Sequence, residues 1–251
     1  METFPIDMFE EVAPKRPRGR KNKNRNEPQR IEQSIQLRAI YPKTDNQALA
    51  IEYFQDGSNL ALVGSAGTGK TFLSIAMAMK SILAGEHKKL IIVRSAVPTR
   101  DIGFLPGNEK QKLAVYETPY VSIFRELFGR ADSYEIFKNK RVVEFIPTSY
   151  VRGITVDDAI IVVDECQNMS FHELSSIITR VGDNTRIIFS GDFFQSDLLK
   201  EAEKKGLSNF IKVLDNMKSF RKVEFVESDI VRSSLVKDFI VQCNKMGLSS
   251  S

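Results

Sequence analysis

The sequence is poor in the residues on which small secreted domains and zinc-binding domains depend. Its 251 residues include no tryptophan, two cysteines (Cys166 and Cys243) and two histidines (His87 and His172). These cysteines and histidines show no CxxC or HxxxH spacing, which argues against a structural zinc site or a disulfide framework. We therefore interpret both cysteines as free thiols of a reducing compartment.

Long hydrophobic runs are also missing. The longest, Ala159–Val163, has the length of a buried strand and is far short of the roughly 20 residues of a membrane helix. The chain begins METFPIDMFEE, which is acidic and lacks the apolar core of a secretory signal. We therefore expect a cytoplasmic chain that has no membrane partner.

Positive charge is concentrated in one short stretch. The formal net charge is +4, and residues 15–25 (KRPRGRKNKNR) carry seven basic side chains and no acidic one. Residues 1–30 are poor in aliphatic side chains, so they cannot bury enough apolar surface to offset the entropy of ordering. We expect a disordered basic N-terminal tail over residues 1–30 and one folded domain over residues 31–251.

The basic stretch suits a nucleic-acid backbone. Arg16–Lys21 (RPRGRK) is similar to the core of an AT-hook, in which Arg-Gly-Arg lies in the minor groove of A·T-rich duplex DNA. Lys21 stands where an AT-hook usually has proline. A sequence-independent polycation for duplex DNA or other nucleic-acid phosphates is a further interpretation. A solvated tail without a partner and a targeting signal are the remaining alternatives.

Beyond residue 40, strand patterns alternate with helix patterns. Short runs of aliphatic and aromatic residues predict strands at Asn59–Val63, Leu90–Val93, Arg141–Ile146, Ala159–Val163, Arg186–Phe189 and Lys222–Val226. Between them, Thr71–Leu83 is apolar almost all round, and Ser170–Glu173 forms a capping box. The alternation predicts an α/β fold, with a parallel sheet that helices cover on both faces.

Two apolar stripes at helical spacing lie in the second half of the chain. The first, after the capping box, contains Leu174, Ile177, Ile178 and Val181. The second, near the C-terminus, contains Leu235, Val236, Phe239, Ile240 and Cys243. Each stripe predicts an amphipathic helix that packs its apolar side against the core.

The strongest motif lies between the first predicted strand and the helix that follows it. Residues 64–71 (GSAGTGKT) match G-x-x-x-x-G-K-[ST], whose glycines let backbone N–H groups surround a polyphosphate at a helix N-terminus. Lys70 can reach the β- and γ-phosphates of ATP, and the Thr71 hydroxyl can bind Mg²⁺. The predicted nucleotide-binding residues here are Gly64, Ser65, Ala66, Gly67, Thr68, Gly69, Lys70 and Thr71.

An acidic pair follows the strand predicted at Ala159–Val163. Asp164 comes directly after the strand, where a carboxylate can hold Mg²⁺ through its water shell. Glu165 can polarise the attacking water as a general base. The sequence therefore predicts Thr71 and Asp164 as Mg²⁺ ligands, and Lys70 and Glu165 as catalytic residues.

Six sequence strings in this order resemble the PhoH-like ATPase family, over roughly residues 40–245. They are Gly64–Thr71, Gly103–Gly107, Tyr150–Gly153, Asp164–Asn168, Ser190–Gln195 and Asp229–Arg232. The chain departs from the family pattern at Cys166, in place of alanine, and at Ser233-Ser234, in place of His-Pro. The resemblance implies a RecA-like P-loop domain, similar to one half of a superfamily 1 helicase, with ATPase activity on single-stranded RNA or DNA.

The resemblance also implies roles for four further residues. Gln47 is similar to the glutamine with which helicases recognise adenine, since one carboxamide can both donate to and accept from the base edge. Asp192 and Gln195 are similar to the element that senses the γ-phosphate. Arg232 is expected to act across a subunit boundary on the phosphates of a neighbouring chain.

Other basic and aromatic residues on predicted strand ends and loops could line a groove for a single strand. They are Arg94, Arg100 and Arg152, with Tyr150 or Phe104 as platforms on which bases stack. Solvated surface arginines are the alternative interpretation.

We therefore predict Mg²⁺-dependent ATP hydrolysis coupled to nucleic acid, with ATP and Mg²⁺ as cofactors. Movement along a strand requires two RecA-like domains, so either the chains form a homo-oligomeric ring, such as a hexameric helicase, or ATP is hydrolysed without translocation. Two alternatives stay open: a nucleoside kinase of thymidine-kinase type, and a DNA-binding accessory protein that uses ATP as a switch without hydrolysing it.

Overall fold

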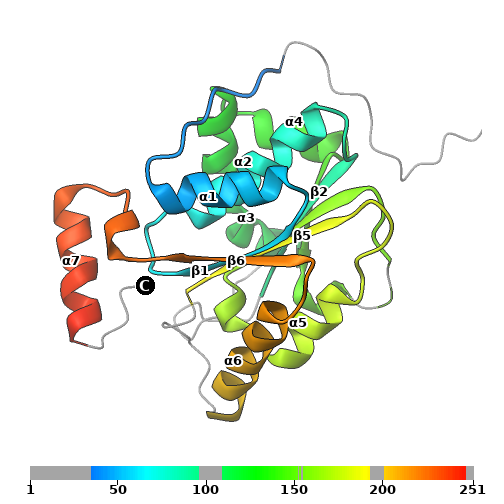
Figure 1. Ribbon diagram of the computed structural model, residues 1–251. Helices are drawn as coiled ribbons and strands as arrows, with labels where there is room; N and C mark the ends of the chain where they lie inside the picture. Colours follow the sequence, from blue (N-terminus) through cyan, green and yellow to red (C-terminus); the bar gives the residue numbers. More distant parts are fainter. Residues whose placement is uncertain (1–34, 96–108, 152, 154, 193–200, 247–251) are drawn as a thin grey trace, which may run out of the picture.

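A six-stranded sheet in the order β3-β2-β4-β5-β1-β6 runs through the computed structural model (Figure 1). The structure describes residues 35–95, 109–151, 153, 155–192 and 201–246. The strands are β1 (Asn59–Gly64), β2 (Lys89–Arg94), β3 (Val143–Pro147), β4 (Ala159–Asp164), β5 (Arg186–Gly191) and β6 (Phe220–Phe225). All neighbouring strands are parallel, as the alternation of strand and helix patterns predicts.

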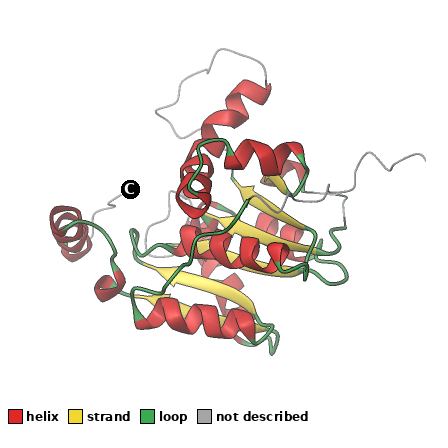
Figure 2. Cartoon of the chain, turned by 90° about the horizontal axis from the view of Figure 1, so that it is seen from above, coloured by secondary structure: helices red, strands yellow, loops and turns green. Residues whose placement is uncertain are grey.

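Helices cover both faces of the sheet (Figures 1 and 2). They are α1 (Asp45–Gln55), α2 (Lys70–Leu83), α3 (Glu109–Phe128), α4 (Ser133–Asn139), α5 (Phe171–Ile178), α6 (Glu201–Asp215) and α7 (Ser234–Lys245), with short 3₁₀ turns η1 (Thr148–Tyr150), η2 (Cys166–Asn168) and η3 (Glu227–Asp229). Helices α1 to α4 pack on one face, and α5 and α6 pack on the other. Over the described residues, no helix has the combination of length and apolar character that crossing a bilayer requires.

Strand β4 shows why its sequence is apolar throughout. Ile160 and Val162 belong to the core on the α1–α4 side, whereas Ile161 and Val163 belong to the core on the α5–α6 side. Because side chains alternate along a strand, a strand buried on both faces needs apolar residues at every position. The predicted α/β fold with a doubly covered parallel sheet is therefore confirmed.

Most strand boundaries differ from the sequence prediction by one or two residues, and two differences have a visible local cause. Strand β3 begins at Val143 instead of Arg141, because Arg141 has a φ of +59°, which lies outside the range of a β-strand. Helix α5 ends at Ile178, and Val181 lies beyond it, paired with Val156 in an isolated parallel bridge.

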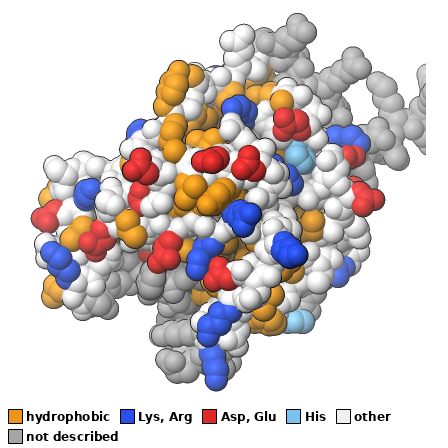
Figure 3. All heavy atoms as spheres, in the orientation of Figure 1, with side chains coloured by type: hydrophobic (Ala, Val, Ile, Leu, Met, Phe, Trp, Pro, Cys, Tyr) orange, Lys and Arg blue, Asp and Glu red, His pale blue; other side chains and the backbone are white. Residues whose placement is uncertain are grey.

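Helix α7 packs less of its apolar stripe than predicted. Ile240 and Cys243 are buried, and Ile240 Cδ1 would lie 3.2 Å from a Cβ built on Gly67. Leu235 and Phe239, in contrast, are 78% and 61% exposed. Figure 1 shows α7 beside the sheet instead of on either face, and Figure 3 shows hydrophobic side chains at the surface of this lobe. The stripe therefore contacts the domain along one edge only.

Candidate functional site

The candidate site lies at the carboxyl ends of β4, β5 and β1, which are neighbours in the sheet. The phosphate loop, residues 64–69, connects β1 to the N-terminus of α2. A Cβ built on Gly64 would lie 1.9 Å from the carbonyl oxygen of Phe225, so only glycine fits there. Gly69 precedes α2 with a φ of +83°, which brings the helix N-terminus to face the loop.

Lys70 is the first residue of α2, and its side chain folds over the phosphate loop. Its Nζ donates to the carbonyl oxygens of Gly64 at 2.8 Å and Ser65 at 2.7 Å. Burial lowers the pKa of Lys70, and the carboxylates of Asp192 and Glu165 act in the opposite direction. The loop thus holds a buried positive charge, which an anionic phosphate would stabilise.

Thr71 and Asp164 join the phosphate loop to the acidic strand end. Thr71 Oγ1 donates to Asp164 Oδ1 at 2.7 Å. Asp164 is 3% exposed, and its burial, together with the charge of Glu165, raises the pKa of its carboxyl group. A hydroxyl and a carboxylate are oxygen ligands of the kind that Mg²⁺ binds beside nucleotide phosphates. The two predicted metal ligands therefore lie together and fit this ion.

Glu165 has an uncommon backbone conformation at the site. Its φ is +51°, which is rare for a residue with a side chain. Its carboxylate accepts a hydrogen bond of 2.5 Å from Gln167 Nε2. The positive φ and this bond fix the direction of the predicted general base, and the role of Gln167 was not part of the sequence prediction.

Asp192 links the end of β5 to the phosphate loop. Its Oδ2 accepts a hydrogen bond of 3.1 Å from the backbone N–H of Ala66, and its own N–H donates to Gln167 Oε1 at 3.2 Å. A carboxylate thus binds an N–H group of a loop whose N–H groups suit anions. Asp192 thus lies at the phosphate loop and its sensing of the γ-phosphate stays a prediction, whereas Gln195 lies outside the described residues.

Gln47 lies in the first turn of α1, against the phosphate loop. Its Nε2 donates to the carbonyl oxygen of Thr68 at 2.9 Å, and its Oε1 accepts from the backbone N–H of Lys43 at 2.8 Å. The side chain is buried, so it supports the loop directly. Recognition of adenine by Gln47 stays a prediction.

The segment after β6 packs against the phosphate loop. The N–H of Val231 donates to the carbonyl oxygen of Gly67 at 3.1 Å, and Arg232 Cγ would lie 3.2 Å from a Cβ built on Gly67. Asp229 Oδ2 accepts a hydrogen bond of 2.8 Å from Asn46 Nδ2, which ties the segment to α1. Arg232 therefore lies beside the loop of its own chain, with its side chain exposed.

Two residues that sequence reasoning missed or placed elsewhere complete the site. The Tyr120 hydroxyl, from α3, donates to Asp164 Oδ2 at 2.9 Å. Arg94, the last residue of β2, is partly buried and hydrogen-bonded to the Tyr120 hydroxyl, although we expected it to line a groove. Tyr120 belongs to no motif, and an aromatic residue in a helix is indistinguishable in sequence from an ordinary core residue.

The other predicted nucleic-acid contacts are mostly outside the described residues. These are Arg100, Phe104, Arg152 and residues 1–30. Tyr150, at the end of η1, is described and is 56% exposed. It therefore has the accessibility that a stacking platform needs.

The fold and the site together define an α/β P-loop nucleotide-binding protein, with a phosphate loop after β1 and an acidic strand end two strands away. The sequence matches the PhoH-like protein family over residues 39–244, and the chain belongs to this family.

Several known sequences and structures are similar to this chain. It is 32% identical over 216 residues to a PhoH-like protein of Bacillus subtilis, covering 86% of this chain and 67% of the relative. It is 33% identical over 198 residues to the protein PhoH of Escherichia coli, covering 78% and 56%. The chain thus spans 56% to 67% of the length of these two relatives. Among solved structures, the large terminase of a thermophilic bacteriophage aligns with a TM-score of 0.47 and 12% identity, over 79% of this chain and 50% of the terminase.

Proposed function

We propose that this chain hydrolyses ATP in a Mg²⁺-dependent reaction that is coupled to nucleic-acid binding. The observation that carries the proposal is the 2.7 Å hydrogen bond between Thr71 Oγ1 and Asp164 Oδ1. It unites the phosphate loop and the acidic strand end, and Lys70 lies at the start of the same helix as Thr71. Mg²⁺ bound there would supply neutralisation of phosphate charge.

Each residue of the site has a task in ATP hydrolysis. The backbone N–H groups of residues 64–69 and the Lys70 ammonium group bind the phosphates. Thr71 and Asp164 would hold Mg²⁺. Glu165 accepts a proton from the attacking water. The hydrogen bond from Gln167 holds its carboxylate at the strand end.

The nucleic-acid part of the proposal is supported by the seven basic side chains of residues 15–25 and by the family resemblance. The test measures phosphate release from ATP with and without single-stranded RNA or DNA, together with the mass of the complexes by light scattering. Stimulation by either nucleic acid is the expected result. If neither RNA nor DNA changes the rate of phosphate release, and light scattering detects no complex, the coupling is contradicted.

The basic stretch itself can be tested by deleting residues 1–25. If its seven basic residues each contact a duplex-DNA phosphate, the slope of log K against log salt should shrink by up to about 6. The ATPase rate without nucleic acid should stay unchanged. An unchanged salt slope would show that the stretch does not contact phosphate.

Two other functions would give different results in the phosphate-release assay. The string Asp164-Glu-Cys-Gln167 also suits a nucleoside kinase, which would transfer phosphate to added thymidine instead of releasing it. A DNA-binding accessory protein with a nucleotide switch would bind ATP and release no phosphate above the rate of a Glu165→Gln variant. Thymidine-independent phosphate release that depends on Glu165 would exclude both.

We further propose that the chains assemble with Arg232 acting on nucleotide bound by a neighbouring chain. Support comes from the exposed Arg232 side chain beside the phosphate loop and from the exposed apolar residues of α7 next to it, Leu235, Val236 and Phe239. An arginine that neutralises charge on the γ-phosphoryl group accelerates hydrolysis by about 10³–10⁵-fold. Its position at the edge of its own loop is compatible with a shared site only if chains pack around this edge.

Mixing two inactive variants tests this arrangement. Lys70→Ala and Arg232→Ala chains are each intact where the other is changed, so mixed interfaces that pair a normal Lys70 with a normal Arg232 should regain ATPase activity. If Arg232 acts within its own chain, activity should not return, because no chain in the mixture carries both a normal Lys70 and a normal Arg232. Absence of recovery in proven mixed oligomers would then contradict the shared site.

A further inference from the structure

The Asp164 carboxylate has two hydroxyl partners, one on each oxygen. Thr71 donates to Oδ1 at 2.7 Å, and Tyr120 donates to Oδ2 at 2.9 Å. Thr71 belongs to the phosphate-loop motif, whereas Tyr120 comes from α3, on the face of the sheet covered by α1 to α4. The carboxylate is therefore held from two independent elements.

Tyr120 is itself held firmly. Its side chain is fully buried, and its ring lies against Phe145 of β3 with 5.9 Å between the ring centroids. Its hydroxyl is also hydrogen-bonded to Arg94. The ring packing and the Arg94 contact together leave the hydroxyl directed at Asp164.

We propose that Tyr120, oriented by Arg94, is a positioning residue that fixes the Asp164 carboxylate for Mg²⁺ binding. A carboxylate held at both oxygens loses little rotational freedom when a metal ion binds, and groups that orient metal ligands in this way commonly change metal affinity by about 10–100-fold when they are removed. This inference rests on the proposed function, because it assumes that Thr71 and Asp164 hold Mg²⁺.

The chain contains a matched control for this tyrosine. Tyr134 of α4 is also buried, its hydroxyl donates to the carboxylate Oε2 of Glu117 at 2.7 Å, and its ring lies edge-on to Phe124 of α3. Tyr120→Phe and Tyr134→Phe therefore each remove one buried hydroxyl–carboxylate hydrogen bond and keep the ring. Only the first affects Asp164.

The experiment titrates Mg²⁺ into the parent and both variants in the presence of fluorescent ADP, with EDTA as the metal-free arm. For Tyr120→Phe, the Mg²⁺ concentration at half-maximal enhancement of ADP binding should rise by about 10-fold. Its ADP affinity in EDTA should stay within about twofold of the parent, since the phosphate loop is unchanged. Tyr134→Phe should match the parent in both arms, and thermal unfolding of each variant confirms that it is folded.

Each outcome decides the proposal. Unchanged Mg²⁺ dependence in Tyr120→Phe would overturn it, and so would an equal shift in both variants, because a general loosening of the core would then be the cause. A parent protein whose ADP binding ignores Mg²⁺ would contradict the metal site itself, and therefore the proposed function as well. If Tyr120→Phe fails to fold, Arg94→Met should still raise the Mg²⁺ requirement, and an unchanged requirement would overturn the proposal.

Discussion

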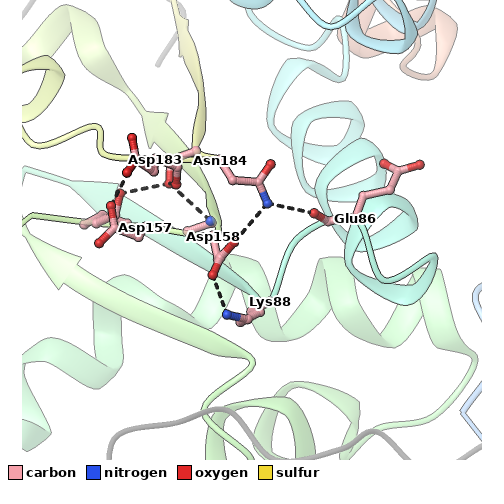
Figure 4. A network of polar contacts seen from close by, with 9 residues as sticks. Glu86, Lys88, Asp157, Asp158, Asp183 and Asn184 are labelled. Atoms are coloured by element: carbon pink, nitrogen blue, oxygen red, sulfur yellow. Dashed lines mark hydrogen bonds and ion pairs between the residues drawn. The ribbon is translucent and has the colours of Figure 1, made fainter.

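One aspartate directly precedes strand β4 and another is its last residue, and the two carboxylates have opposite surroundings. Asp158 precedes the strand, where Lys88 and Asn184 donate hydrogen bonds to it and lower the pKa of its carboxyl group (Figure 4). Asp164 ends the strand, and burial raises the pKa of its carboxyl group. At the amino end, the negative charge of Asp158 is therefore paired with Lys88 of the same chain. At the carboxyl end, Asp164 is a buried acidic group whose negative charge a bound cation would stabilise.

The amino end of the sheet is a network of loop contacts. The N–H of Asp158 donates to the carbonyl oxygen of Asp183 at 2.9 Å, and the N–H of Asp183 donates to Asp157 Oδ1 at 2.8 Å (Figure 4). Asn184 Nδ2 donates to the carbonyl oxygen of Glu86 at 3.1 Å. These bonds join three connections of the fold, and because they are largely exposed, each contributes little to stability.

The carboxyl end has the opposite character. Lys70 and Asp164 are both charged side chains with less than a tenth of their surface exposed. Burying such groups costs free energy that packing alone does not recover, and perturbed charges of this kind are typical of functional sites. The comparison predicts that substitutions at the carboxyl end abolish activity, whereas those at the amino end change only stability.

The largest effect is expected for Lys70→Ala. Loss of the ammonium group at the phosphate loop should reduce ATP turnover by about 10³-fold or more and bring ATP binding close to the detection limit. Equilibrium binding of fluorescent ATP and phosphate release measure the two effects. Lys80→Ala, in the last turn of the same helix, is the matched control, and an equal loss in that variant would contradict the assignment.

Glu165→Gln should separate binding from hydrolysis. The variant should bind ATP nearly as well as the parent, while hydrolysis falls by about 10²-fold or more, as expected for loss of a general base. Single-turnover hydrolysis of bound ATP measures the chemical step directly. Glu86→Gln, at the amino end, should hydrolyse at the parent rate. Turnover by Glu165→Gln at the parent rate would show that Glu165 is not the base.

At the amino end, His87 should make stability depend on pH. Burial and the nearby charge of Arg186 lower the pKa of His87, so the unfolded chain takes up this proton near pH 6.5 and the folded chain only at lower pH. The free energy of unfolding should therefore fall as the pH drops below about 6.5, with a His87 contribution of at most about 1.4 kcal/mol per pH unit. His87→Gln should reduce this slope in urea unfolding at pH 7.5 and pH 5.5. A slope identical to that of the parent would contradict the assignment.

The smallest effect is expected for Lys88→Ala. This change removes an exposed partner of Asp158, so the melting temperature should fall by less than about 3 °C. The rate of ATP hydrolysis should stay the same. A larger loss of stability, measured by differential scanning calorimetry, would mean that the amino-end network is a stronger clamp than its exposure indicates.

Much of the fold was predictable because strands buried on both faces have a continuous apolar sequence. Ala159–Val163 is such a run, and the structure confirms it as β4. The boundary at Arg141 was not predictable, since its positive φ reflects the turn after α4 and not its own preference. The exposure of Leu235 and Phe239 was not predictable either, because an amphipathic pattern does not reveal how much of its apolar side finds a partner.

The candidate site was predictable where its residues are contiguous in sequence. Residues 64–71 begin at the last residue of β1 and Asp164 is the last residue of β4, and parallel strands bring such residues to one edge of the sheet. The place of Tyr120 and Arg94 in the site could not be predicted from the sequence, because their contacts with each other and with Asp164 form only when α3 packs on the sheet. Tertiary packing, not local pattern, therefore determines how the Asp164 carboxylate is oriented.

The most direct test of the proposed Mg²⁺ site compares the two aspartates at the ends of β4. The measurement is the initial rate of Mg²⁺-dependent phosphate release from ATP by Asp164→Asn and Asp158→Asn, each relative to the parent. We expect Asp164→Asn to lose about 10²-fold or more, because it removes the carboxylate that we propose as a Mg²⁺ ligand. Asp158→Asn should stay within about twofold, because asparagine tolerates the φ of +53° at this position. Equal losses in the two variants, or a parent rate in Asp164→Asn, would contradict the proposed role of Asp164 in Mg²⁺-dependent ATP hydrolysis.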